Sequence, residues 1–173
     1  MNRAPFQLAP LDVAHDRVRF NCGSEPLNRY LQAQVTQDVR RRVAACFVAL
    51  ADSQHIAGYY TLASASLILA DLPDSTGKKL PRYPTVPAVR MGRLAVDEAF
   101  KGQGLGGALL ADALDRAARS EIAAYALMVN AKDEAAAAFY RHHSFIALPD
   151  SPHTLFLPLA TVLPTRKTDN KAR

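Results

Sequence analysis

Four glycines fall within seven residues of this chain, in the segment 101–107 (KGQGLGG), which separates a predicted strand from a predicted helix. Glycine is a poor residue with which to begin a helix unless the backbone must approach another group closely. The first turn of a helix exposes unpaired N–H groups and the positive end of the helix dipole. The segment therefore predicts an anion site at the start of that helix, suited to a diphosphate.

Three kinds of phosphate loop compete for this segment. A Walker A loop ends in Gly-Lys-Ser/Thr, and Gly106–Gly107–Ala108 lacks that ending. A Rossmann fingerprint belongs to an early βα unit, whereas this turn lies in the middle of the chain. The remaining candidate is a loop that binds the pyrophosphate of coenzyme A. The turn is weak evidence by itself, because some glycine-rich turns are only structural.

The hydrophobic pattern predicts a mixed α/β domain with a central sheet. We place a single domain at residues 1–160, followed by a polar, basic and disordered tail at 161–173. Strands are predicted at 7–11, 44–50, 56–64, 88–96, 124–129, 145–148 and 154–159, and helices from 24 or 25 to 38, at 104–120 and at 133–142. Four prolines make 71–87 a loop, with a short helical turn near 78–80.

The sequence also predicts a compartment. No apolar run approaches the roughly 20 residues of a membrane span, and the N-terminus lacks the apolar stretch of a secretory signal. We therefore expect a cytoplasmic protein. Cys22 and Cys46 have no metal-ligand spacing, so free buried thiols are the simpler interpretation and no metal site is expected.

The net charge of +5 is unevenly distributed. Basic residues gather in 1–50, in the tail, and in 78–101, where six oppose two acids. The candidates for a charged surface are Arg40, Arg41, Arg42, Lys78, Lys79, Arg82, Arg90 and Arg93, with Tyr83 among them as a ring that can stack on a base. This pattern favours a polyanionic partner, although solvated faces of ordinary proteins carry such charges too.

Two motifs resemble those of the GNAT acetyltransferases. That family's signature is Gln/Arg-x-x-Gly-x-Gly/Ala after a strand of the form RLAV, and this chain has RLAV at 93–96 and KGQGLG at 101–106. The family's later FYxxxGF motif corresponds to FYRHHSF at 139–145. Lys101 replaces the usual Gln or Arg, Ser144 replaces Gly, and Asp133 stands where many members have Asn. The resemblance implies a GNAT fold, a mostly antiparallel twisted sheet of six to seven strands flanked by about four helices.

A closer resemblance extends to about Leu159. It is to the GNAT toxins of type II toxin–antitoxin pairs, which acetylate the amino group of aminoacyl-tRNA. The matching pieces are FNCG at 20–23, LNRYL at 27–31, QDVRRR at 37–42, GYYTL at 58–62, LPRYP at 80–84 and DEAA at 133–136. The resemblance implies a cytosolic homodimer that uses acetyl-CoA. It also implies a small ribbon-helix-helix antitoxin that covers the site, with operator DNA bound only through the antitoxin complex.

The resemblance assigns roles to particular residues. The resemblance makes Tyr140 the acid that protonates the leaving thiolate, whereas without the resemblance an amphipathic core tyrosine is the simpler interpretation. Cofactor contacts fall on Leu94, Ala95, Val96, Lys101, Gly102, Gln103, Gly104, Leu105, Gly106, Gly107, Asp133 and Phe139. The basic residues named above, together with Tyr83, are the expected tRNA-binding residues.

No general base stands out in the sequence. The pair His142–His143 at a helix end is more often a solvated cap than a base. An α-amino group has a pKa of about 7.7–8, and a neighbouring ester lowers it further by electron withdrawal. Much of an aminoacyl-tRNA amine is then neutral without a dedicated base.

Two alternatives remain open at this point. One is a GNAT enzyme that acetylates a small amine or a protein lysine, and the basic residues weigh mildly against it. The other is an acyl-CoA-binding protein that serves as a co-repressor and performs no transfer.

Overall fold

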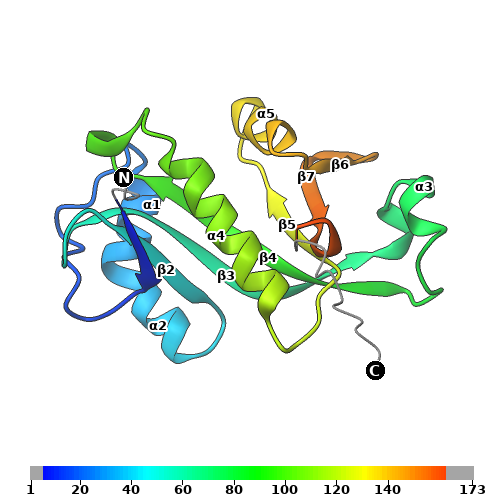
Figure 1. The fold of residues 1–173 in the computed structure, drawn as a ribbon, viewed down its shortest axis with the longest axis horizontal. Coiled ribbons are helices and arrows are strands. Elements are labelled where there is room, and N and C mark those ends of the chain that lie inside the picture. The colour runs from blue at the N-terminus through cyan, green and yellow to red at the C-terminus, as the bar shows by residue number, and fades with distance from the viewer. Residues whose placement is uncertain (1–5, 163–173) are drawn as a thin grey trace, which may run out of the picture.

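The computed structural model describes residues 6–162, which form a seven-stranded sheet in the order β1-β2-β3-β4-β5-β7-β6 (Figure 1). The strands are β1 (Gln7–Pro10), β2 (Ala45–Leu50), β3 (Ile56–Ile68), β4 (Thr85–Val96), β5 (Ala126–Asn130), β6 (Ile146–Leu148) and β7 (Ser151–Pro158). Neighbouring strands are antiparallel except β4 and β5, which are parallel. The mostly antiparallel sheet of the predicted α/β fold is thereby confirmed.

Helices cover both faces of this sheet (Figure 1). They are α1 (Glu25–Arg29), the π-helical segment η1 (Tyr30–Gln34), α2 (Val35–Arg40), α3 (Asp74–Gly77), α4 (Leu105–Arg119) and α5 (Glu134–His142), with 3-10 turns η2 (Leu69–Asp71), η3 (Glu98–Phe100) and η4 (Leu159–Thr161). Tyr60 packs in one core with α4 and α5, and Tyr59 packs in another with η1 and α2. Because side chains alternate along a strand, these two neighbours in β3 point to opposite faces.

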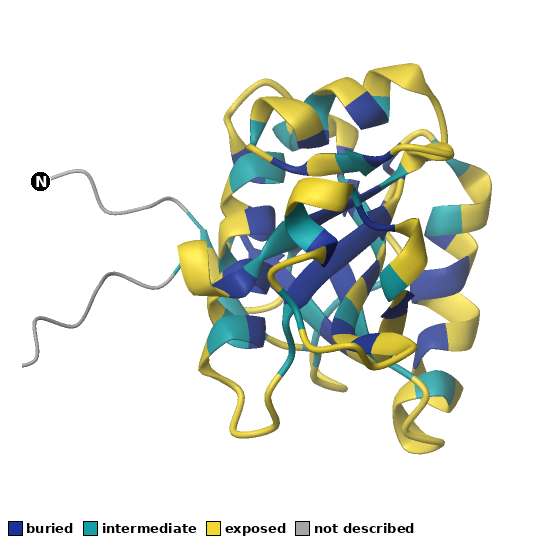
Figure 2. Cartoon of the chain, turned by 90° about the vertical axis from the view of Figure 1, so that its right-hand side faces the viewer, coloured by how far each residue is buried: buried dark blue, intermediate teal, exposed yellow. Residues whose placement is uncertain are grey.

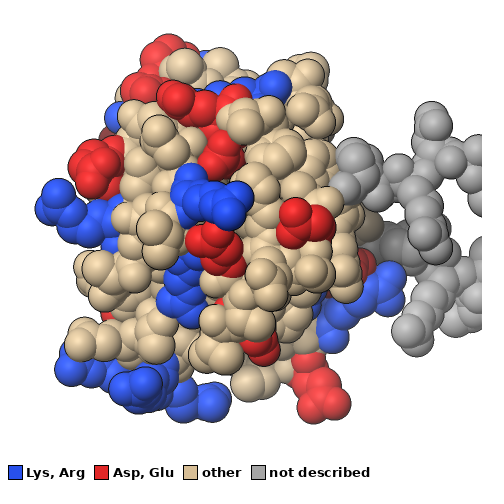
Figure 3. Space-filling view, turned by 90° about the vertical axis from the view of Figure 1, so that its left-hand side faces the viewer, with Lys and Arg blue, Asp and Glu red and all other residues tan. Residues whose placement is uncertain are grey.

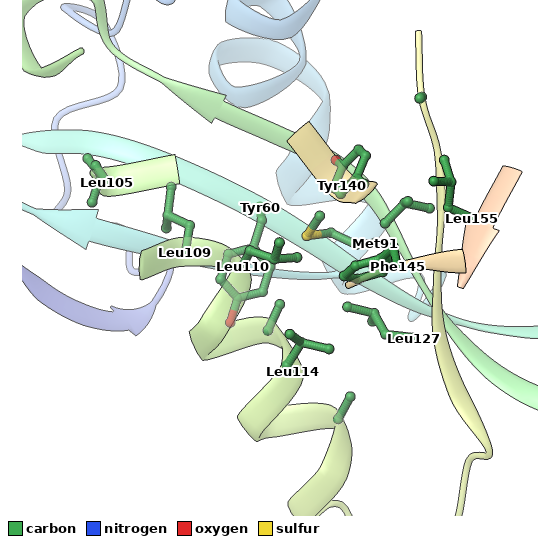
Figure 4. Packing of buried hydrophobic residues seen from close by; sticks show 14 of the residues in the cluster. Tyr60, Met91, Leu105, Leu109, Leu110, Leu114, Leu127, Tyr140, Phe145 and Leu155 are labelled. Atoms are coloured by element: carbon green, nitrogen blue, oxygen red, sulfur yellow. The ribbon is translucent and has the colours of Figure 1, made fainter. Parts of the chain in front are cut away.

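The core beneath α4 comes from the helical spacing of its apolar residues. Leu105, Leu109, Leu110 and Leu114 are buried and lie along one side of the helix, toward Tyr60 and the other sheet residues (Figure 4). Burial of one leucine side chain contributes about 1.5–3 kcal/mol. The opposite side of the helix is exposed, so the buried residues concentrate between the layers (Figure 2).

β4 continues beyond the strand that it parallels. It pairs with β5 only over 88–91, and from Gly92 to Val96 it keeps β3 as its sole strand neighbour, so that β4 and β5 diverge (Figure 1). Gly92 is an extra residue in the ladder, because Leu62 pairs with Met91 while Thr61 pairs with Arg93. Such a bulge bends and twists a strand. The edge of β4 that faces β5 is therefore open after Met91.

The structure differs from the predicted elements in several places, and β7, for example, begins at Ser151 instead of 154. The first helix contains the π-helical turn η1 and runs to Arg40. β3 extends to Ile68 and β4 begins at Thr85, because the segments 65–68 and 85–87 become strands by pairing with β4 and β3, although Ala65, Ser66 and Pro87 have little preference for strand. The helical turn predicted near 78–80 lies earlier, at α3.

The predicted disordered tail lies outside the described residues from position 163 onward. Between residues 6 and 162, none of the helices has the length and apolar character needed to cross a bilayer.

Candidate functional site

The turn before α4 has the geometry that its glycines predict. Gly102 and Gly104 have φ angles of 78° and 77°, in the left-handed region that favours glycine. A Cβ atom at either position would meet no atom within 4 Å, so the space beside the turn is open. Gly104 precedes α4 without a side-chain cap, and the first turn of α4 contains no acidic residue.

The N-terminus of α4 is therefore an electropositive cradle. Within the described part of the chain, the amides of residues 103–107 donate to no backbone acceptor. α4 is 15 residues long, so its dipole adds partial positive charge at the same place. Free amides and a positive helix end together suit a phosphate or diphosphate group.

Helix α5 packs against this first turn of α4. A Cβ atom at Gly106 would lie 3.8 Å from the ring of Phe139, and one at Gly107 would lie 3.4 Å from Cε1 of His143. The Phe139 ring lies 4.7 Å from the His143 ring and 5.3 Å from the Tyr140 ring, between centroids. The glycine turn and the FY pair therefore meet on one side of the molecule, as coenzyme A binding requires.

Tyr140 lies at the edge of the core, with 8% of its surface exposed. Its ring packs against Phe145 at 5.5 Å between centroids (Figure 4). Within residues 6–162 the hydroxyl forms no hydrogen bond. Every fully buried side-chain oxygen of that range does have a partner, so the Tyr140 hydroxyl is not fully buried and reaches accessible space. Burial raises the pKa of Tyr140 to about 12. The phenol is thus protonated at neutral pH and available to a ligand.

The open edge of β4 borders this region. Leu94 and Val96 pack toward the α4 core, and Ala95 packs on the opposite face of the sheet. On the side facing β5, alternate N–H and C=O groups of the segment 92–96 have no strand partner. An extended molecule with amide groups can pair with such an edge as an added strand does.

Asp133 occupies the N-cap of α5, as the sequence predicts. Its Oδ1 accepts a hydrogen bond from the N–H of Ala136 at 2.8 Å, which satisfies one free amide of the helix start. The side chain is exposed, and its second oxygen forms no hydrogen bond within the described range. That oxygen is open to a ligand.

The glycine turn is fastened to the segment 20–23. The ammonium group of Lys101 donates to the carbonyl of Cys22 at 2.9 Å, which leaves two of its three donors for other partners. Asp97 is only 6% exposed and accepts from the N–H groups of Asn21 at 3.0 Å and Ala99 at 2.9 Å. These bonds fix the position of the turn relative to the sheet.

The predicted tRNA-binding residues fall in three places. Arg40, Arg41 and Arg42 are exposed where α2 ends, and Arg42 lines a hollow of about 570 Å³ that reaches Ser64 of β3. The second group is Lys78, Arg82 and Tyr83, which line a hollow of about 670 Å³ formed by the end of β3 at Ile68 and the connection from β3 to β4. Lys79 is exposed and adjoins Lys78 in the chain. Ser64, in the first hollow, and Ile68, in the second, are four residues apart in β3, so about 13 Å of strand separates these two lining residues.

The third place is β4 itself. Arg90 is exposed, whereas Arg93 is half-buried and its guanidinium carbon lies 3.4 Å from the centroid of the Tyr30 ring. Basic residues are thus spread along the strands instead of forming one compact cluster. The left-hand face of the molecule carries both signs of charge (Figure 3).

A family model described as Acetyltransferase (GNAT) family matches residues 14–145. This chain belongs to the GNAT acetyltransferases. It is accordingly an acyltransferase, and its glycine turn, open β4 edge and FY pair lie within the matched GNAT region.

Individual GNAT relatives are similar over most of the chain. A tRNA-acetylating toxin of Mycobacterium tuberculosis is 36% identical over 156 residues, which are 89% of this chain and 90% of the relative. The structure of AtaT complexed with acetyl-methionyl-tRNAfMet has a TM-score of 0.85 and 32% identity, covering 91% of this chain and 96% of that one. A tyrosine-to-phenylalanine variant of AtaT, bound to acetyl-CoA and the C-terminus of the antitoxin AtaR, has a TM-score of 0.77 and 26% identity with the same coverage. The resemblance to GNAT toxins is confirmed.

Sequence reasoning missed three features of this GNAT site. A lone glycine inside a strand pattern, Gly92, is a signal that could have predicted the bulge. The stack of Tyr30 under Arg93 and the bond between Asp97 and Asn21 join segments far apart in the chain, and no local pattern announces them.

Proposed function

We propose that this GNAT enzyme transfers the acetyl group of acetyl-CoA to the α-amino group of aminoacyl-tRNA, and that it blocks translation as the toxin of a type II toxin–antitoxin system. The observation that carries the proposal is the position of the Phe139 ring, 3.8 Å from where a Cβ atom at Gly106 would lie, since the neighbouring Tyr140 is thereby carried on the helix that approaches the anion cradle of α4. The relatives support it, since one is named for tRNA acetylation and AtaT structures contain acetylated tRNA or acetyl-CoA.

The residues of the site fit acetyl-CoA, which supplies the acetyl group as a reactive thioester. The free amides of 103–107, with Gly102 and the remaining donors of Lys101, suit its diphosphate. The open edge from Leu94 to Val96 suits the amides of its pantetheine arm, and the free oxygen of Asp133 borders α5, which carries Phe139 and Tyr140.

Tyr140 acts as the general acid in this proposal. Its pKa of about 12 keeps the proton on Oη at neutral pH, and Oη passes that proton to the departing sulfur as nitrogen replaces sulfur on the acetyl carbon. A backbone N–H on the open edge of β4 stabilises the negative charge that develops on the carbonyl oxygen. The attacking amine releases one proton to solvent, and the phenolate of Tyr140 takes one up from solvent, so the acid is restored and the charges balance.

The surroundings of Tyr140 favour an amine that is already neutral. The rings that contact it are those of Phe139 and Phe145, and neither can accept a proton. An α-amino group with a pKa of about 7.7–8, lowered further by its ester, has a large neutral fraction at pH 7, whereas a lysine side chain near 10.4 does not. Together with the basic residues of β4 and of the two hollows, this supports aminoacyl-tRNA over a protein lysine or a small amine.

The decisive experiment measures acetyl transfer to charged tRNA. The wild-type protein with labelled acetyl-CoA should label charged tRNA and stop cell-free translation. Tyr140→Phe should lose about 10²–10⁴-fold in rate, the usual contribution of a positioned acid, and should still bind acetyl-CoA in calorimetry. Tyr125→Phe, at a tyrosine outside the site, is the matched control and should keep full activity.

Three outcomes of this assay would redirect the proposal. Turnover of small amines or lysine peptides with no transfer to charged tRNA would show a different acceptor. Acetyl-CoA binding with no transfer to any amine would favour the co-repressor alternative. A fully active Tyr140→Phe variant would remove the acid role from this residue.

The same proposal includes the surroundings of the enzyme. Charged tRNA is cytoplasmic, so we infer that the protein acts there, as a homodimer neutralised by a ribbon-helix-helix antitoxin that also brings the complex to operator DNA. An AtaT–AtaR complex bound to DNA, similar to this chain with a TM-score of 0.72 and 28% identity, supports the last part. Light scattering should give twice the chain mass of 18.8 kDa, and a value near 18.8 kDa would refute the homodimer.

A further inference from the structure

Arg93 is the first residue of β4 after the Gly92 bulge, and the bulge decides where its side chain goes. Its Cα pairs with that of Thr61, which in turn pairs with Cys46, so the three residues form one row across the sheet. This row lies on the face covered by η1 and α2, opposite the α4 core that receives Leu94. Arg93 thus sits on the open edge of β4 but points away from the cofactor cradle.

Tyr30 holds the guanidinium group of Arg93 in place. The guanidinium carbon lies 3.4 Å from the centroid of the Tyr30 ring, a cation–π contact. Tyr30 is buried, with 4% of its surface exposed, and its ring stacks on that of Tyr59 at 6.4 Å between centroids. Its hydroxyl donates to Asp38 at 2.8 Å, and the Tyr59 hydroxyl donates to the carbonyl of Leu27 at 2.6 Å. The surface under Arg93 is therefore rigid.

The N–H groups of this arginine are unused. Within residues 6–162, Arg93 forms no hydrogen bond and no ion pair, and the nearby carboxylate of Asp38 receives the Tyr30 hydroxyl instead. Arg116 shows the contrast. It also lies over an aromatic ring, that of Phe47 at 4.2 Å, but its Nε is bound to Asp112 at 2.8 Å.

The geometry points to a phosphate-binding site made by Tyr30 and Arg93, which holds one phosphate of the acceptor RNA strand on the face of the sheet covered by η1 and α2. A guanidinium group stacked flat on a ring presents its edge, and two parallel N–H donors on that edge match two phosphate oxygens. Arg93 makes the contact, and Tyr30 is a positioning residue that acts through it. This inference rests on the proposed function, because it takes the acceptor to be a tRNA.

The test separates the two residues and compares them with a matched arginine. Arg93→Gln should raise the KM for charged tRNA about tenfold, equivalent to about 1.4 kcal/mol, and should leave kcat within about twofold. The salt dependence of tRNA binding should lose about one phosphate contact, a change of about 0.7–0.9 in the slope of log K against log salt. Arg90→Gln removes an exposed arginine of the same strand that lies over no aromatic ring of residues 6–162, and it should change KM by less than Arg93→Gln does.

Variants of Tyr30 distinguish positioning from mere folding. Tyr30→Phe keeps the ring and should bind tRNA nearly as well as wild type, whereas Tyr30→Leu should reproduce the KM of Arg93→Gln. The double variant Tyr30→Leu/Arg93→Gln should be no worse than Arg93→Gln alone, since both changes remove one interaction. Calorimetry with acetyl-CoA should give the wild-type Kd for every variant that folds. If Tyr30→Leu fails to fold, Arg93→Lys decides in its place, and it should be weaker than wild type because it lacks the planar fork.

The inference and the proposed function can fail separately. If wild type acetylates charged tRNA and Arg93→Gln leaves both KM and the salt slope unchanged, the phosphate site is wrong and the function stands. If wild type acetylates no tRNA, the salt dependence of binding to uncharged tRNA still tests the phosphate site. An Arg93→Gln variant with the wild-type slope of log K against log salt overturns the site, and a smaller slope supports it.

Discussion

The ring of Phe139 lies 3.8 Å from the position that a Cβ atom on Gly106 would take, so the helix that carries Tyr140 and the helix that begins at the glycine turn approach each other at their functional ends. A side chain larger than alanine at position 106 would collide with the ring and displace α5. The absence of a side chain there thus serves the spacing between α4 and α5 as well as access to the backbone amides.

Two glycines of this turn should respond differently to alanine. Gly104 has a φ of 77°, so Gly104→Ala should destabilise the fold by about 1–2 kcal/mol and weaken acetyl-CoA binding. Gly106 lies in the helix, and its Cβ would make an ordinary contact at 3.8 Å, so Gly106→Ala should be neutral or stabilise by up to about 1 kcal/mol. Urea unfolding measures both, and equal effects would contradict this account.

Tyr140 should make the protein sensitive to alkaline pH. Its pKa of about 12 in the folded state exceeds the value of 10 expected in the unfolded chain. Above pH 10 the unfolded chain releases a proton that the folded chain keeps, so stability falls by up to about 1.4 kcal/mol per pH unit until pH reaches the folded value. Tyr140→Phe should show a shallower fall between pH 10 and 12 in urea titrations, and parallel curves for both proteins in that range would refute it. Below pH 10 the two curves should run parallel.

Asp112 joins α4 to the sheet, and its loss should be costly. It accepts from the Tyr60 hydroxyl at 2.5 Å and from Nε of Arg116 at 2.8 Å, and desolvation raises the pKa of Tyr60. Asp112→Ala leaves the hydroxyl of a buried tyrosine without an acceptor and should cost about 1–3 kcal/mol. Asp115→Ala breaks an exposed pair with Arg119 on the same helix and should cost under about 1 kcal/mol. Thermal unfolding compares the two, and similar losses would argue against the buried bond.

Asp133 should matter for the start of α5. Asp133→Ala removes the acceptor for the Ala136 amide and should cost about 1 kcal/mol, while Asp133→Asn keeps an acceptor and should be nearly neutral. If Asp133 also contacts the cofactor, the Ala variant should bind acetyl-CoA more weakly at a temperature where it is fully folded. Wild-type affinity in that variant would restrict the residue to its capping role.

Local patterns predicted most of the elements of this fold. The glycines before α4, the apolar spacing within α4 and the cap at Asp133 are all short-range signals, and the structure has each of them. The ends of β3 and β4 were predicted too short, because the segments 65–68 and 85–87 become strands only through each other. The π-helical turn at Tyr30 has no signature in the residues that form it.

In the candidate site, too, local motifs predicted some features, whereas contacts between distant segments could not be predicted. Tyr140 and the glycine turn are found from motifs, and their proximity could be expected from the family resemblance. The contacts of Lys101 with Cys22 and of Arg93 with Tyr30 each join residues more than 60 positions apart in the chain. Only the packed structure reveals which basic residues have free donors.

The bulge at Gly92 makes chain length at this position as strict as residue identity. Inserting one residue between Gly92 and Arg93 would shift the pairing of β4 with β3 by one position, and every later side chain would exchange faces up to Val96. Arg93 would then lie opposite Tyr60 in the hydrophobic core under α4, while the inserted residue would take its place over Tyr30. A lengthened chain would therefore lose its charge at the sheet edge and bury an unpaired cation in one step, even though no residue had been replaced.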